Sequence, residues 1–188
     1  MENTFYALLG RMKYIDRWCV MRNTQKETLS EHTLETAYLV HSLILLNHAR
    51  GGSLSPERAV LYALYHDCSE ILTGDMPTPV KYKNESIRTA YKEVEHQSEA
   101  ALLDRLPQEM ADDMAQWFCP TDEYRPYIKA ADKLSALIKC IEERKAGNHE
   151  FDRAYDTLLA AIHALELPEA EQFLQQFLPP YGLTLDDL

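Results

Sequence analysis

The chain has 188 residues, of which 46% are hydrophobic and 26% charged, a balance typical of a globular protein. Its 30 acidic and 19 basic residues give a formal net charge of -11 at pH 7, which argues against nucleic acids and anionic membranes as partners. A small anionic substrate stays open, because it responds mainly to the local field of its site. We expect one domain over residues 1–188.

Neither the first residues of the chain nor its cysteines indicate export. The first residues, MENTFYALLGRMKYIDR, lack the basic leader and apolar run of a signal peptide. The longest apolar run, AYLVHSLILL, is too short to cross a bilayer. The cysteines form no C-x-x-C pair, so we expect free buried thiols in a reducing cytosol. The prediction is a cytoplasmic protein that binds no membrane.

Helix signals follow one another from the N-terminus. One or two helices are predicted from residue 2 to about residue 22. The next starts at SEHTLETAYLVH with Ser30 as its N-cap, and Gly51-Gly52 ends it. A third starts at SPERAVLYALYHD with Ser55 as its N-cap and ends by Gly74.

The second half of the chain repeats this pattern. Helices are predicted from about 85 to 106, in a short segment from Pro107, and over 122–148. Two more are predicted near 150–165 and 168–178. Sustained alternation of apolar and polar residues is missing, so no strand is predicted. The prediction is an all-α fold, a bundle of seven to nine helices without a sheet.

The stretch YHDCSEILTGDMPTP places charged residues at the end of the third predicted helix. On a continuous helix Ala63, His66, Asp67 and Glu70 share one face, and the other faces are apolar. A buried carboxylate without a partner is costly, and a divalent cation held by histidine and aspartate removes that cost. Glu70 near a helix C-terminus also opposes the helix dipole, which favours a functional role.

Two ligands hold a catalytic metal weakly, and two further candidates are present. His32 lies in the first turn of its helix, and Asp132 lies within KAADKLSALIKC, where aspartate is a poor helix residue. Taken singly, His32 is equally well a helix-start residue and Asp132 the N-cap of a helix that starts later. The order H…HD…D favours a metal more than any one member does. Nitrogen and oxygen ligands suit Mn, Co, Fe, Ni or Zn.

These residues and their surroundings resemble the HD-domain phosphohydrolases, and within them the bacterial 5'-deoxynucleotidases. The similar segments are RMKYIDRWCVMRNT (11–24), LSEHTLETAYLVH (29–41), YHDCSEILTGDMPTPVKY (65–82) and KAADKLSALIKCIEE (129–143). The resemblance implies an HD-domain helical bundle and a homodimer. It also implies one divalent metal and removal of phosphate from deoxyribonucleoside 5'-monophosphates.

The resemblance also implies roles for individual residues. The implied metal ligands are His32, His66, Asp67 and Asp132. The implied catalytic residues are Glu70 and Arg17. The implied substrate contacts are Arg17, Trp18, His32, Asp67, Asp75, Met76, Pro77, Thr78 and Asp132. Glu70 would protonate the leaving oxygen or orient water, and the planar guanidinium of Arg17 suits phosphate oxygens.

Two further segments are implied to surround the nucleoside. Trp18 would leave no room for a 2'-hydroxyl, and the rigid Asp75–Thr78 loop would form a wall of the site, with Asp75 accepting a sugar hydroxyl. The residues alone also allow simpler readings: a solvated basic face around Arg17, a core aromatic at Trp18, and an ordinary helix terminator after Gly74.

Two other functions remain open. A related HD phosphohydrolase would act on nucleoside triphosphates or cyclic nucleotides, and its products would reveal it. A helical binding module with a vestigial metal site would show neither bound metal nor activity.

Overall fold

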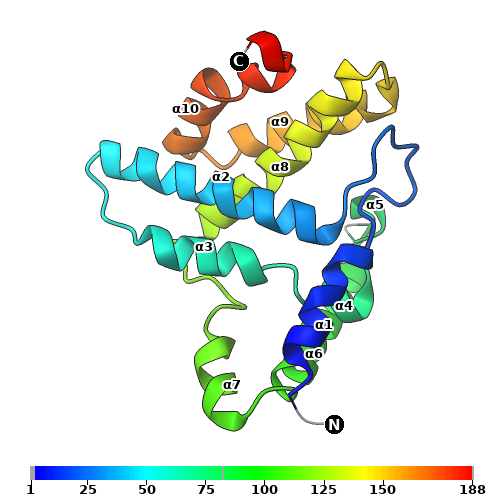
Figure 1. The fold of residues 1–188 in the computed structure, drawn as a ribbon, viewed down its shortest axis with the longest axis vertical. Coiled ribbons are helices and arrows are strands. Elements are labelled where there is room, and N and C mark those ends of the chain that lie inside the picture. The colour runs from blue at the N-terminus through cyan, green and yellow to red at the C-terminus, as the bar shows by residue number, and fades with distance from the viewer. Residues whose placement is uncertain (1–2, 82, 188) are drawn as a thin grey trace.

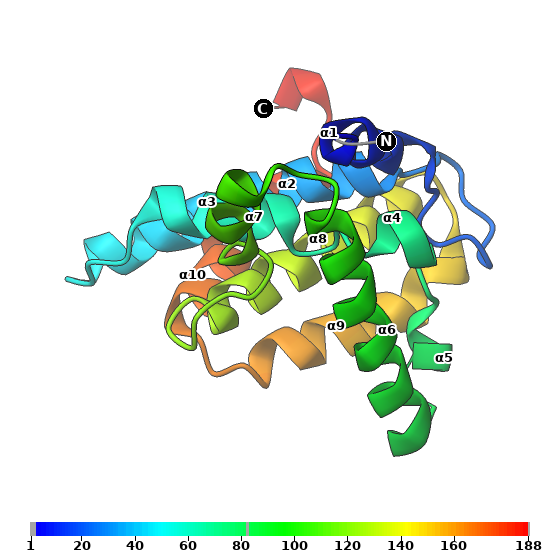
Figure 2. The ribbon, with the colours of Figure 1, turned by 90° about the horizontal axis from the view of Figure 1, so that it is seen from below.

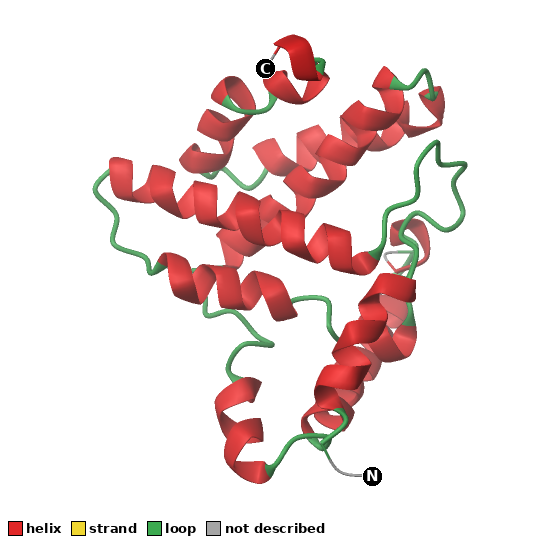
Figure 3. Ribbon diagram, in the orientation of Figure 1, coloured by secondary structure: helices red, strands yellow, loops and turns green. Residues whose placement is uncertain are grey.

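The computed structural model describes residues 3–81 and 83–187, with only the backbone described at residues 78 and 79. Helices joined by loops make up this part of the chain (Figure 3). The α-helices are α1 (Phe5–Leu9), α2 (Leu29–Ala49), α3 (Pro56–Tyr65), α4 (Glu70–Thr73), α5 (Thr78–Lys81), α6 (Glu85–Leu103), α7 (Gln108–Ala115), α8 (Arg125–Lys145), α9 (Asp152–His163) and α10 (Pro168–Gln176). The 3-10 helices are η1 (Gly10–Tyr14), η2 (His149–Phe151), η3 (Pro179–Gly182) and η4 (Leu185–Asp187).

The predicted all-α class is confirmed. Of the α-helices in the described residues, eight have five residues or more, within the predicted seven to nine. The only strand-like pairing in those residues is an isolated bridge between Asp16 and Thr28.

The two longest helices, α2 and α8, cross at the centre of the molecule (Figure 1). α3 packs on α2 and α8, and α9 packs on α8. Val40, Leu43 and Ile44 of α2 and Leu134 and Leu137 of α8 are fully buried in this core. Burying a leucine or isoleucine stabilises a fold by about 1.5–3 kcal/mol, so this crossing holds His32 and Asp132 on a rigid frame.

A second, smaller core lies beside the first. It joins Phe5 of α1, Cys68 after α3, Leu102 of α6 and Phe118 after α7. Phe5 and Phe118 stack with ring centroids 6.4 Å apart. α1, α4 and α6 form a group to one side of the α2–α8 crossing in both views (Figures 1 and 2). Burial of Cys68 in this second core therefore holds the turn that carries His66 and Asp67.

The start of α2 differs from the prediction. Thr28, and not Ser30, is its N-cap. The Thr28 hydroxyl accepts the N–H of Glu31 at 3.3 Å, and the Glu31 carboxylate accepts the N–H of Thr28 at 2.7 Å. With this capping box the helix begins two residues earlier than a Ser30 cap allows, and His32 becomes its fourth residue instead of its second.

The N-terminal segment is less helical than predicted. Helical backbone ends at Tyr14, and residues 15–28 form a loop instead of continuing to about residue 22. The loop closes on itself: Arg17 N–H donates to the Glu27 carbonyl at 2.9 Å, and Leu29 N–H donates to the Ile15 carbonyl at 2.8 Å. Arg17 and Trp18 therefore lie on a closed loop, not on a helix.

The third predicted helix is interrupted. α3 ends at Tyr65, and α4 begins at Glu70 after a turn. In the turn Cys68 N–H bonds to the carbonyl of Tyr65, and Glu70 N–H to that of Asp67, each three residues back. The prediction of one shared helix face was wrong, because this backbone is wound more tightly than an α-helix. Glu70 lies in the first turn of α4, so the dipole argument for its role is also wrong.

Three other expectations have outcomes. Asp132 lies within α8, so it is not the N-cap of a later helix. Cys68 and Cys140 are buried as expected, but Cys19 and Cys119 are exposed. No helix within residues 3–81 and 83–187 combines the length and apolarity needed to span a membrane.

Candidate functional site

Four side chains from three parts of the chain converge. His32 comes from α2, His66 and Asp67 from the turn after α3, and Asp132 from α8. One nitrogen or oxygen atom from each lies within 4.8 Å of those of the others. The spacing H…HD…D thus becomes a compact group in space, although its first and last members, His32 and Asp132, are 100 residues apart along the chain.

Both imidazoles present an unbonded nitrogen to this group. The Nε2 atoms of His32 and His66 are buried and have no hydrogen-bond partner in the described part of the chain. His32 Nε2 lies 3.5 Å from Asp67 Oδ2 and 3.3 Å from Asp132 Oδ1, and His66 Nε2 lies 3.1 Å from Asp67 Oδ2. Buried polar atoms are normally paired, and a cation between these nitrogens and oxygens would pair all of them. The donor set therefore fits a divalent metal.

The opposite nitrogen of His66 sets its tautomer. His66 Nδ1 lies 2.7 Å from the carbonyl oxygen of Ala63. A carbonyl only accepts, so Nδ1 carries the hydrogen and the neutral ring leaves the Nε2 lone pair facing the group. The last turn of α3 thereby prepares His66 as a ligand.

His32 is oriented by a longer chain of contacts between α2 and α8. Its Nδ1 lies 2.9 Å from Ser135 Oγ, and Ser135 donates to Glu35 Oε2 at 2.6 Å. The serine hydroxyl has one hydrogen, which goes to the carboxylate, so Oγ accepts from His32 Nδ1–H. The Nε2 lone pair of His32 is then also directed at the group. Burial raises the pKa of Glu35 to about 7 despite the Ser135 hydrogen bond.

The charges of the group favour a cation. Burial disfavours the ionised form of Asp67, but His66 and His32 outweigh it and lower its pKa well below the ordinary value. Burial likewise favours a neutral His66, but Asp67 and then Asp132 raise its pKa to about 9. Without a metal His66 is therefore protonated at neutral pH, and a cation that binds at its Nε2 atom would replace this proton and leave the ring neutral.

Glu70 lies beside the group without belonging to it. It is buried, and its Oε2 atom has no hydrogen-bond partner among the described residues. Burial, followed by repulsion from Asp67 and Asp75, raises its pKa to about 9 against the opposing effect of Lys81. A carboxyl group that keeps its proton at neutral pH is suited to donate it.

Arg17 reaches the group from the closed loop. Its Nη1 lies 3.7 Å from Asp67 Oδ2, and its Nε lies 3.3 Å from Glu27 Oε2. The side chain is only 11% exposed. Burial lowers the pKa of Arg17, but Glu27, then Asp67, outweigh it and raise that pKa. Trp18 follows directly, and its indole Nε1 also donates to Glu27 Oε2, at 2.8 Å. Arg17 is thus turned inward, whereas the other basic residues of this segment, Arg11, Lys13, Arg22 and Lys26, are exposed to solvent.

The loop after Glu70 is only partly joined to the site. Asp75 lies near Arg17 and the backbone of Trp18, and burial raises its pKa against their effect. Met76 and Pro77 are half-buried. Among the described contacts, neither forms a hydrogen bond with the metal group, that is, with His32, His66, Asp67 or Asp132. The side chain of Thr78 lies outside the described residues.

Sequence reasoning missed the residues that hold the predicted ones in place: Glu27, Glu35 and Ser135. Glu35 lies three residues after His32, and Ser135 lies three residues after Asp132, so helix geometry already puts each near its neighbour. This spacing places each residue near the site, but their contact with one another across α2 and α8 is not visible in it. Glu27 offered no such signal, because its contact with Arg17 and Trp18 depends on closure of the loop.

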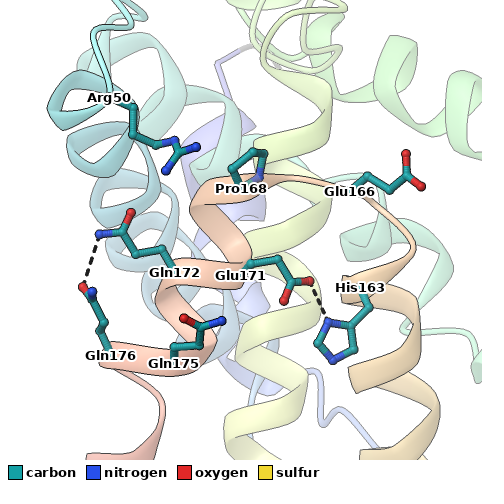
Figure 4. A pocket seen from close by; sticks show the side chains of 8 residues that line it. All are labelled: Arg50, His163, Glu166, Pro168, Glu171, Gln172, Gln175 and Gln176. Atoms are coloured by element: carbon teal, nitrogen blue, oxygen red, sulfur yellow. Dashed lines mark hydrogen bonds and ion pairs between the residues drawn. The ribbon is translucent and has the colours of Figure 1, made fainter.

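A separate open groove of about 600 Å3 lies at the far end of α2 (Figure 4). It is lined by Arg50, His163, Glu166, Pro168, Glu171, Gln172, Gln175 and Gln176. His163 pairs with Glu171 at 2.6 Å. Arg50, the C-cap of α2, follows His32 by 18 residues. At the helical rise this separates the two residues by about 27 Å along the axis of α2. The groove contains none of the predicted site residues.

Comparison with known proteins identifies the family. The family described as 5'-deoxynucleotidase YfbR-like matches residues 4–181. A 5'-deoxynucleotidase of Vibrio parahaemolyticus is 44% identical over 191 aligned residues, covering 100% of this chain and 98% of its own. The chain belongs to the YfbR-like 5'-deoxynucleotidase family. Another relative, the 5'-deoxynucleotidase YfbR of Escherichia coli O1:K1, is 41% identical over all of this chain and 96% of its own.

Solved structures support the fold of this family. An HD-domain phosphohydrolase from Listeria innocua superposes with a TM-score of 0.85 at 23% identity, covering 95% of this chain and 88% of that one. The cyanophage S-2L HD phosphohydrolase DatZ, solved with dA and one catalytic Zn2+ ion, gives a TM-score of 0.68 at 21% identity. It covers 98% of this chain and 100% of that one. The predicted HD-domain helical bundle is confirmed.

Proposed function

We propose that this protein is a metal-dependent 5'-deoxynucleotidase, which hydrolyses deoxyribonucleoside 5'-monophosphates to deoxyribonucleosides and phosphate. Membership of the YfbR-like family along the whole chain supports the activity. The observation that carries the chemistry is the pair of unbonded Nε2 atoms of His32 and His66, turned toward Asp67 and Asp132 with Arg17 beside them. We further propose that residues 1–188 act as one domain.

His32, His66, Asp67 and Asp132 would hold one divalent cation. A bound cation supplies Lewis-acid chemistry to a phosphate oxygen and lowers the pKa of water. The nitrogen and oxygen donors suit Mn, Co, Fe, Ni or Zn. His32, Asp67 and Asp132 would also border the space for the phosphate, because Arg17 Nη1 lies 3.7 Å from Asp67 Oδ2 and His32 Nε2 contacts both aspartates.

Arg17 and Glu70 are proposed to act on the two ends of the bond that breaks. The guanidinium of Arg17 would bind phosphate oxygens, since its Nη1 already points at the anionic group. Hydrolysis joins a water oxygen to phosphorus and breaks the bond to the 5'-oxygen. Glu70 would donate its proton to that leaving oxygen, which its raised pKa prepares it to do.

Selection of deoxyribose is assigned to Trp18 and the loop after Gly74. Trp18 would exclude a 2'-hydroxyl by its bulk, and Asp75 would accept a hydrogen bond from a sugar hydroxyl. Met76, Pro77 and Thr78 would line the nucleoside. The proximity of Asp75 to Arg17 and to the backbone of Trp18 supports a common site for sugar and phosphate.

We also propose that the protein is a cytoplasmic homodimer. Leu34, Tyr38 and Leu45 form an exposed apolar row on α2, and Tyr38 is 66% exposed. Tyr6 of α1 and Leu185 near the C-terminus are also exposed. α1, α2 and the red C-terminal segment lie along one face of the molecule (Figure 2). An apolar face of this kind suits a second copy of the chain.

The identity of the product tests the activity. The purified protein is incubated with deoxyribonucleoside mono- and triphosphates and with cyclic nucleotides, and the products are separated by chromatography. We expect phosphate and a deoxyribonucleoside from the monophosphates. Release of triphosphate, or opening of a cyclic nucleotide, would instead assign the protein to another HD phosphohydrolase activity. Loss of turnover in Asp67→Ala is the control for the site.

A further inference from the structure

Glu27 occupies a position that the proposed reaction does not explain. Its Oε2 atom accepts a hydrogen bond from Trp18 Nε1 at 2.8 Å and another from Arg17 Nε at 3.3 Å. The Glu27 side chain is only 12% exposed, so these bonds are largely shielded from water. One carboxylate oxygen therefore contacts both the proposed phosphate anchor and the proposed sugar wall.

The backbone makes the same connection. The carbonyl of Glu27 accepts the N–H of Arg17 at 2.9 Å, and the next pair, Asp16 and Thr28, forms the isolated bridge. Trp18 has a φ angle of 55°, in the left-handed region that a bulky residue rarely adopts. A strained residue of this kind persists only where its surroundings fix it. The loop is thus closed at Glu27 and tightly turned at Trp18.

The shared oxygen limits how both side chains are oriented. An indole has one N–H donor, so the bond to Glu27 selects one orientation of the Trp18 ring. The ring also packs edge-on against Phe151, with centroids 5.2 Å apart. For Arg17, the bond to Glu27 uses Nε, so the two terminal nitrogens stay on the side of Asp67, where the phosphate is proposed to bind. Without Glu27, the guanidinium would be drawn to Asp67 alone.

We infer that Glu27 is a positioning residue that couples phosphate binding by Arg17 to sugar selection by Trp18. The inference rests on the proposed function, since it takes the roles of these two residues from it. Glu27 itself does not touch the reacting atoms. It sets the ring that excludes the 2'-hydroxyl and keeps the guanidinium fork turned toward the phosphate.

Two substitutions separate the parts of this role. Glu27→Ala removes both bonds, so we expect discrimination between deoxyribo- and ribonucleotides to fall by about 10- to 100-fold, as for a misplaced binding group. Glu27→Gln keeps an acceptor for the indole but loses the charge that holds Arg17. We expect Glu27→Gln to keep most of the discrimination while kcat/KM falls for both substrates.

A matched control comes from η2, which contacts the same loop. Glu150 accepts from the backbone N–H of Arg22 at 3.1 Å and pairs with its guanidinium at 3.5 Å, so it tethers the loop without contacting Arg17 or Trp18. Glu150→Ala should leave discrimination unchanged. If it relaxes discrimination as much as Glu27→Ala does, general tethering of the loop explains the effect and the inference is wrong.

A readout independent of activity tests the contact itself. The chain has two tryptophans, Trp18 and Trp117, so NMR of the indole N–H groups gives two assignable signals. We expect the Trp18 signal to move upfield in Glu27→Ala while that of Trp117 stays in place. An unmoved Trp18 signal together with unchanged discrimination would overturn the inference. If Glu27→Ala does not fold, the kcat/KM loss in Glu27→Gln decides the question.

Failure of the proposed function gives a different pattern. Wild-type protein that hydrolyses ribo- and deoxyribonucleotides equally, or Trp18→Ala protein that still rejects ribonucleotides, would remove the assigned role of Trp18. Trp18→Ala that relaxes discrimination while Glu27→Ala does not would leave the function intact and refute only the coupling. In the double variant we expect no further relaxation beyond Trp18→Ala alone, because both changes act on one ring.

Discussion

Glu70→Gln should stabilise the protein when the metal has been removed. In the metal-loaded protein the same substitution should abolish phosphate release. Glu70 is buried with one oxygen lacking a partner, and burial raises its pKa from 4.5 to about 9. In the folded protein it keeps its proton at neutral pH, whereas in the unfolded chain it is ionised. Its contribution to stability is therefore complete below about pH 4.5 and is lost as pH rises toward about 9.

The size of this effect follows from the two pKa values. One pH unit between them changes the free energy of unfolding by about 1.4 kcal/mol. From pH 4.5 to pH 7 the loss is then about 3 kcal/mol. Glutamine is neutral in both states and escapes this loss. For a chain of this length, about 3 kcal/mol corresponds to roughly 6–12 °C in Tm.

Thermal unfolding at several pH values measures the difference. Wild-type and Glu70→Gln proteins, both stripped of metal, are compared from about pH 5 to about pH 8. The Tm advantage of Glu70→Gln should grow steadily with pH. Glu109→Gln, on the exposed surface of α7, should show no such growth. An advantage that stays constant across this range would refute the protonated state of Glu70. Full turnover by Glu70→Gln would refute its role as proton donor.

Three other substitutions test separate parts of the structure. Ser135→Ala should weaken metal binding by about 10- to 100-fold in calorimetric titration, because His32 loses its orienting partner; unchanged affinity would contradict this. Glu143→Ala should lower the free energy of unfolding in urea by about 3–5 kcal/mol, because it leaves Lys139 buried without its partner at 2.5 Å. If Glu143→Ala is as stable as the wild-type protein, water must solvate Lys139 in place of Glu143. If the protein is the proposed dimer, Tyr38→Glu should convert it to a monomer in light scattering, and a dimer that persists in Tyr38→Glu would place the interface elsewhere.

Much of the fold was readable from periodicity and capping. Pro168 and the residues after it formed the predicted last α-helix, and the long apolar pattern of residues 30–50 formed α2. The start of α2 was missed, although Thr28 and Glu31 have the spacing of a capping box. Ser30 competed as an N-cap, and only the local hydrogen bonds decide between them.

The breaks in helices were harder to predict. Residues 15–28 and the turn at 66–69 contain no proline, so local propensity gave no reason for the chain to leave the α-helix there. The turn is held by burial of Cys68 in the second core, and the loop by bonds between Arg17 and Glu27. Both are tertiary effects that a single sequence does not reveal.

The metal group itself was predicted by residue type and chain order, and the structure brings its four members together. One argument for this group was wrong, because His66 and Asp67 lie in a turn and not on a helix face. Residue chemistry was thus a better guide than helix geometry. The orienting residues Ser135 and Glu35 depend on how α2 crosses α8, which no local pattern specifies.

The most direct test of the central proposal is metal-dependent phosphate release by the wild-type protein. The protein is stripped with a chelator, single cations are added back, and matched deoxyribo- and ribonucleoside 5'-monophosphates are assayed side by side. We predict no release from the stripped protein, and recovery with at least one of Mn, Co, Fe, Ni or Zn that favours the deoxyribonucleotides. Undiminished release from fully stripped protein, or no release with any cation, would contradict the account.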